Sequence, residues 1–122
     1  MAARRFVFFQ TAGGRAPALE WMRTLEAVPV VRLKAVMEML AEHGHTLGRP
    51  HAAPLRDGIS ELRVRVGKAR YRLLYFLHGR ELVILSHGFS KKTDRVPEEE
   101  IERAIRHKDQ FEAAPKLHTH GA

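Results

Sequence analysis

The chain has 122 residues, no cysteine and a formal net charge of +7, with a sequence pI near 10.4. This length fits one domain that can bury its own core, and the lack of thiols excludes disulfides and thiolate metal sites. The longest apolar runs, residues 6–9 and 73–77, are too short for a secretory signal or a membrane span. We therefore expect a cytoplasmic protein without a membrane partner.

The N-terminal half begins with a β-prone run at residues 5–9 and continues with two predicted helices at 16–27 and 29–44. The helices form a hairpin joined around Pro29. Residues 45–60 are rich in glycine and proline, which favours a loop. Nearby histidines His43, His45 and His51 match no strong metal-site spacing, so we expect no metal and no cofactor.

The C-terminal half predicts three strands and a last helix, at residues 61–66, 69–77, 81–89 and 97–111. Two-residue turns are expected at Gly67-Lys68 and at either His78-Gly79 or Gly79-Arg80. The predicted fold class is α+β, with an N-terminal helical hairpin packed on a small antiparallel sheet and a C-terminal helix. We expect one domain at residues 1–112 and a flexible tail at 113–122.

A turn at Gly67-Lys68 would pair Arg65 with Arg70 and Arg63 with Arg72 across two strands. Because strand side chains alternate between faces, all four arginines would share one face. The opposite face would pack on the helices and is expected to hold Leu62, Val64, Tyr71, Leu73, Leu82 and Ile84.

Directly paired like charges destabilise a sheet unless an anion binds them, and guanidinium groups match phosphate oxygens in a bidentate manner. Residues 61–92 hold eight basic and two acidic side chains, a charge of +6 out of the chain total of +7. This concentration favours a nucleic-acid partner. The alternative is that the arginines extend into solvent or pair with acids of the last helix.

The third strand is expected to add His87 and Phe89 to the arginine face, with Arg72 beside His87 or Leu85. His87 is either a proton carrier or a structural histidine, and Phe89 could stack a base. The remaining candidates for RNA binding or catalysis are the basic residues at the ends of these strands: Lys68, Lys91 and Lys92.

Four short motifs occur in order: residues 57–63 (DGISELR), 69–75 (ARYRLLY), 87–93 (HGFSKKT) and 97–101 (PEEEI). Together they resemble the phage-derived HigB-like branch of the RelE/ParE toxin superfamily, over about residues 17–111. The resemblance implies a RelE-like toxin of a type II toxin–antitoxin system. Such a toxin cleaves messenger RNA on the ribosome and is neutralised by an antitoxin, usually a helix-turn-helix protein.

By position, the resemblance makes Arg63 and Arg65 phosphate-binding residues, Arg72 the transition-state arginine and Lys92 a further basic residue. Some relatives carry a catalytic tyrosine shortly after this point, where the present chain has Val96 and Pro97. The implied reaction is attack of a ribose 2′-hydroxyl on the adjacent phosphate, without metal.

Arginine stays protonated and cannot be the general base, so another group must move the proton. On the predicted face His87 is the first candidate, followed by Lys91 or Lys92. Two other functions remain open: inhibition of DNA gyrase, as in ParE members, and RNA binding without catalysis. Loss of cleavage but not of binding in an Arg72 variant would identify a nuclease.

Overall fold

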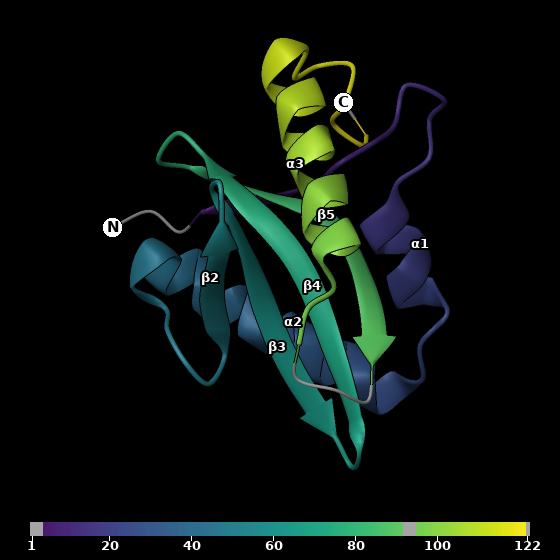
Figure 1. Ribbon diagram of the computed structural model, residues 1–122, viewed down its shortest axis with the longest axis vertical. Helices are drawn as coiled ribbons and strands as arrows, with labels where there is room; N and C mark the ends of the chain where they lie inside the picture. The colour runs from purple at the N-terminus through teal and green to yellow at the C-terminus, as the bar shows by residue number, and fades with distance from the viewer. Residues whose placement is uncertain (1–3, 92–94, 122) are drawn as a thin grey trace.

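The computed structural model describes residues 4–91 and 95–121 (Figure 1). Its helices are α1 (Pro17–Arg23), α2 (Ala27–His43) and α3 (Glu98–Ala113), with a 3-10 turn η1 (Gly44–Thr46). The strands are β1 (Arg5–Phe8), β2 (Ala52–Arg56), β3 (Ile59–Val66), β4 (Ala69–His78) and β5 (Leu82–Lys91). They form one sheet in the order β1-β5-β4-β3-β2, antiparallel except where β1 runs parallel to β5. The predicted α+β class and RelE-like arrangement are confirmed.

The prediction of a loop over residues 45–60 is wrong in its second half, which contains β2. Proline cannot donate to a strand ladder and is tolerated at sheet edges. β2 is such an edge strand, and its pairing with β3 becomes irregular between Pro54 and Arg56. The glycine and proline content of this segment therefore led to the prediction of a loop where β2 forms.

The β3–β4 hairpin has the predicted register. Val66 pairs with Ala69 around a two-residue turn, Arg65 lies opposite Arg70, and Arg63 opposite Arg72. The turn needs Gly67, whose φ of 61° is unfavourable for other residues. The four arginines therefore share one face of the sheet, as the sequence predicts.

The β4–β5 hairpin differs from the prediction. His78 pairs with Leu82, so the loop has the three residues 79–81, and the register shifts at Ser86. Before the shift, Leu82 and Ile84 lie on the face covered by α3, so their predicted contact with the helical hairpin is wrong. Val83 and Leu85 occupy that place.

The register shift also determines what lies beside Arg72. Arg72 pairs with Phe89. The prediction that His87 or Leu85 would lie beside Arg72 on β5 is therefore wrong. His87 pairs instead with Leu74, one step further along the same face. The bulge restores the predicted alternation, so His87 and Phe89 do belong to the arginine-bearing face.

Each face of the sheet has its own core. One face packs on α1 and α2 through residues that include Leu33, Leu40, Leu62 and Leu73. The other packs under α3, which lies across the front of the sheet in Figure 1, while the tip of the β3–β4 hairpin extends beyond it. This second face is therefore covered at one end and open at the other.

The segment after α3, expected as a flexible tail, returns to the sheet. The Gln10 amide donates to the carbonyl of His118 at 2.8 Å, and the His120 amide donates to that of Phe8 at 3.0 Å. The ring of buried His118 stacks on Phe9. Across the described ranges, 4–91 and 95–121, no helix has the length and apolar character needed to cross a bilayer.

Candidate nucleic-acid interface

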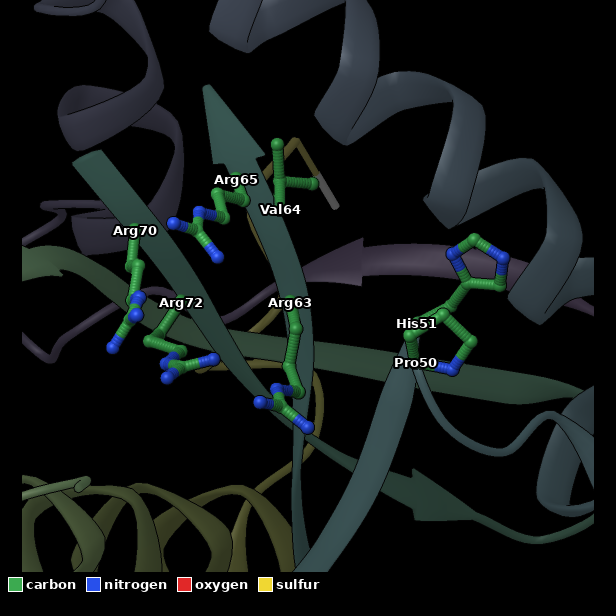
Figure 2. Close-up of a pocket in the computed structure, with 7 residues that line it drawn as sticks. All are labelled: Pro50, His51, Arg63, Val64, Arg65, Arg70 and Arg72. Atoms are coloured by element: carbon green, nitrogen blue, oxygen red, sulfur yellow. The ribbon is translucent and has the colours of Figure 1, made fainter. Parts of the chain in front are cut away.

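A cleft of about 340 Å³ opens at the uncovered end of the α3-side face. Figure 2 shows the four arginine side chains arriving from two neighbouring strands, β3 and β4, with Pro50 and His51 just before β2. The cleft is lined by Pro50, His51, Arg63, Val64, Arg65, Arg70 and Arg72. The four predicted arginines are therefore brought together around one concave surface.

The arginines differ in depth. Arg65 is exposed, Arg70 is half-buried, and the side chain of Arg63 keeps 24% of its surface exposed. Arg72 is 3% exposed and lies at the floor of the cleft. A phosphate entering the cleft would thus meet Arg65 and Arg70 before it approached Arg72.

Glu61 is an acidic component of the site that the sequence analysis did not assign. Its carboxylate Oε1 lies 3.2 Å from Nε of Arg63 and 3.3 Å from a terminal nitrogen of Arg72. Burial raises the pKa of Glu61, while the guanidinium groups of Arg72 and Arg63 oppose that shift. Strand alternation could have identified it, because Glu61 precedes Arg63 by two positions and so shares its face.

His87 lies at the covered end of the same face, outside the cleft lining. It is 1% exposed, and its pKa is lowered from 6.5 to about 3 by burial and by the charges of Arg103 and Arg106, with a contribution from His107. Its Nδ1 lies 2.9 Å from the Ser86 hydroxyl. The imidazole is therefore neutral at physiological pH and shielded from a substrate in the cleft.

The Ser86 hydroxyl also lies 2.8 Å from Nδ1 of His107. A hydroxyl has one proton, so it donates to one imidazole and accepts from the other. Nε2 of His87 makes no hydrogen bond within the described residues but lies 3.4 Å from Oε1 of Glu100, and this nearby carboxylate favours a proton on that nitrogen. Ser86 then donates to His87 and accepts from Nδ1–H of His107, whose pKa burial and Arg103 lower to about 4.

The other predicted residues are dispersed. Phe89 is 9% exposed and packs in the core under α3, so its ring is not an open stacking surface. Lys68 and Lys91 are exposed at the strand ends and line a separate hollow of about 410 Å³ with Ala69 and Ser90. Lys92 lies outside the described residues.

His51, which the sequence suggested only as a possible metal ligand, is a second unpredicted residue of the site. It lines the arginine cleft, and its carbonyl accepts a hydrogen bond of 2.8 Å from the amide of Arg63. Among the described residues, no three histidine or carboxylate side chains are grouped so as to hold a metal ion.

The fold and the cleft together define a small basic α+β domain whose sheet carries an arginine-lined cleft. Residues 20–109 match the family described as phage-derived Gp49-like proteins, and the chain belongs to that family. The family is associated with toxins of RelE/HigB-type toxin–antitoxin systems. A comparison with curated proteins found no significant match.

Proposed function

We propose that this protein is the toxin of a type II toxin–antitoxin system and a ribosome-dependent endonuclease for messenger RNA. The observation that carries the proposal is the cleft lined by Arg63, Arg65, Arg70 and Arg72. Four guanidinium groups around one concavity suit a chain of phosphates. Family membership adds the expectation of an antitoxin partner.

In the proposed reaction, the ribose 2′-hydroxyl attacks the adjacent phosphorus and the bond to the 5′-oxygen breaks. The products are a 2′,3′-cyclic phosphate and a 5′-hydroxyl. The protein holds the backbone in line and stabilises charge on the non-bridging oxygens. Arg65 and Arg70 would bind flanking phosphates, while Arg63 and Arg72 act at the scissile phosphate.

The proton must be carried by a group other than arginine. His87 was the first candidate, but its burial and low pKa argue against it. We propose His51 instead, because it belongs to the cleft lining and imidazole is the commonest proton-transfer group in enzymes. Its ring lies on the α2 side in Figure 2, so its side chain would have to turn toward the arginines to act. Exposed Lys91 is the alternative, and Lys92 remains a further candidate from the family resemblance.

The test is cleavage of a message positioned on purified ribosomes, with mapping of the new ends. The wild-type chain should produce cyclic-phosphate and 5′-hydroxyl ends, and a 2′-deoxy nucleotide at the cut site should block the reaction. Arg70→Gln should slow cleavage, whereas Arg80→Gln, with the same loss of charge in the exposed 79–81 loop, should not.

Other outcomes identify the alternatives. Inhibition of DNA supercoiling by gyrase without RNA cleavage would identify a ParE-like inhibitor. Salt-sensitive RNA binding without cleavage on ribosomes would identify a non-catalytic RNA-binding module. In cells, we expect growth arrest on expression of the chain and recovery when the cognate antitoxin is co-expressed.

A further inference from the structure

We propose that Glu61 is a positioning residue of this site, which fixes the guanidinium groups of Arg63 and Arg72 at the expense of affinity for RNA. The inference rests on the proposed nuclease function, because positioning has a consequence only if a reaction follows. It also predicts a binding effect of opposite sign to the effect on rate, which can be measured separately.

The geometry follows from the register of β3 and β4. Arg63 lies opposite Arg72, and Glu61 lies opposite Leu74, so the carboxylate is diagonal to Arg72 and two positions from Arg63 on its own strand. Its Oε1 reaches both guanidinium groups, at 3.2 Å and 3.3 Å. One carboxylate oxygen therefore connects the two arginines that face each other across the hairpin.

Burial makes this contact more than a surface ion pair. The side chains of Glu61 and Arg72 are 6% and 3% exposed, so each charge needs a fixed counter-charge. A guanidinium has five N–H donors, and the contacts engage Nε of Arg63 and one terminal nitrogen of Arg72.

The same carboxylate is unfavourable for simple anion binding. A negative charge beside the cleft repels phosphate and cancels part of the local positive charge. A cleft selected only to hold RNA would be better without it. A cleft selected to orient two guanidinium groups toward developing negative charge gains from a buried, rigid anchor behind them.

The two roles predict opposite signs. Glu61→Gln removes the charge with little change in size. RNA should then bind more tightly. The slope of log RNA affinity against log salt concentration should become steeper by up to about one unit. The single-turnover cleavage rate should fall by ~10- to ~100-fold, because the arginines lose their fixed orientation. A residue with only a structural role would weaken both properties together.

The experiment measures RNA binding and ribosome-bound cleavage for the wild type and for Glu61→Gln, with Glu81→Gln as the matched control. Glu81 is exposed in the 79–81 loop at the far end of β4, so it has the same charge change outside the cleft. In an Arg72→Gln background, Glu61→Gln should slow the remaining cleavage by a smaller factor than in the wild type, since one of the two guanidinium groups that it orients is already absent.

Glu61→Gln removes a negative charge beside the buried guanidinium of Arg72, so the thermal unfolding of the variant is measured in parallel. If it does not fold, Glu61→Asp takes its place: it keeps the charge but is one methylene shorter. We expect near wild-type affinity and slower cleavage from this variant. Wild-type cleavage by every folded Glu61 variant would overturn the inference, as would equal losses of affinity and rate.

A wild-type chain that never cleaves RNA would overturn the proposed function by itself. The binding comparison would still be decisive for Glu61. Tighter RNA binding by Glu61→Gln than by Glu81→Gln would keep Glu61 as a residue that lowers the RNA affinity of the cleft, while its positioning role would fall with the nuclease. Equal affinities would overturn the effect of Glu61 on RNA binding as well.

Discussion

The two ends of one sheet face carry ionisable groups in opposite states. At the open end, Arg63 and Arg72 keep their charge beside the buried carboxylate of Glu61. At the end covered by α3, His87 and His107 are neutral and share the hydroxyl of Ser86. Strand alternation places His87 on the same face as the arginines, and His107 reaches that face from α3.

The difference lies in what covers each end. α3 carries His107 and brings apolar packing and the cationic residues Arg103 and Arg106 toward His87. Burial and these charges disfavour protonation of both histidines. The hairpin tip extends beyond α3 (Figure 1), and there the exposed Arg65 and the half-buried Arg70 line the open cleft, with Arg72 buried at its floor. A candidate proton carrier must therefore be judged by what packs over it, in addition to the face on which it lies.

The largest expected effect concerns stability at acid pH. The folded-state pKa values are about 3 for His87 and about 4 for His107, below the ordinary 6.5. The unfolded chain therefore binds more protons below pH 6.5. Stability from these neutral histidines is complete above that pH and is lost as pH falls toward 4, by up to about 1.4 kcal/mol per pH unit for each histidine.

Urea unfolding at a series of pH values from 7 to 4 measures this slope. His107→Gln should reduce the slope, because one of the two protons taken up on unfolding disappears. His45→Gln, at an exposed position in η1, is the control and should leave it unchanged. An unaltered slope in His107→Gln would show that the covered end is not responsible for acid sensitivity.

The next effect concerns Arg72 at the floor of the open end. Loss of one preorganised donor to a transition-state anion typically costs ~10²–10³ in rate, so Arg72→Gln should nearly abolish cleavage on ribosomes. Because Arg72 compensates buried Glu61, we also expect a lower melting temperature. Cleavage is therefore measured below the melting range of the variant.

Arg80→Gln is the control for that experiment, since it removes an exposed arginine from the opposite end of β4. Wild-type cleavage by folded Arg72→Gln would exclude the floor of the cleft as the reaction centre. The gyrase-inhibitor and RNA-binding alternatives would then gain support.

Local signals were sufficient to predict the open end. Gly67-Lys68 defines a two-residue turn, and the turn fixes every pair along β3 and β4. The same reasoning was less successful for β5, because a three-residue loop and the bulge at Ser86 change the register in compensating ways. Ile84 was consequently assigned to the wrong face, and His87 to the right one.

The covered end depended on tertiary structure. The sequence predicts α3 but does not say which part of the sheet it covers, and the burial of His87 follows from that choice. Ion pairing was equally hard to predict: acids of the last helix were considered only as alternative partners for the arginines, whereas Glu61 of β3 pairs with Arg63 and Arg72. The burial and the ion-pair partners of these side chains therefore depend on residues that their own strand does not reveal.

A smaller effect is expected for the hydroxyl between the two histidines. Ser86→Ala removes the group that satisfies Nδ1 of both His87 and His107. Leaving buried polar atoms without partners costs about 1–3 kcal/mol, so the free energy of unfolding should fall by roughly that amount. Ser90→Ala, at an exposed position of the same strand, is the control. Equal stabilities would mean that water replaces the hydroxyl at this position.

The smallest expected effect belongs to the rim of the open end. Arg65 is exposed, and its Nε donates to the carbonyl of Gly67 at 3.2 Å, so its removal should leave the fold intact. If it binds one phosphate, Arg65→Ala should reduce the slope of log RNA affinity against log salt by about one unit, since one fewer counterion is released.

The salt dependence of RNA binding tests the location of Arg65 better than the affinity at one salt concentration does. Any loss of positive charge weakens RNA binding somewhat through long-range attraction, and Arg80→Ala measures that background from the 79–81 loop. A phosphate contact adds a change of slope that the background lacks. If both variants change the slope equally, Arg65 acts only through net charge, and the interface begins deeper in the cleft, at Arg63 and Arg70.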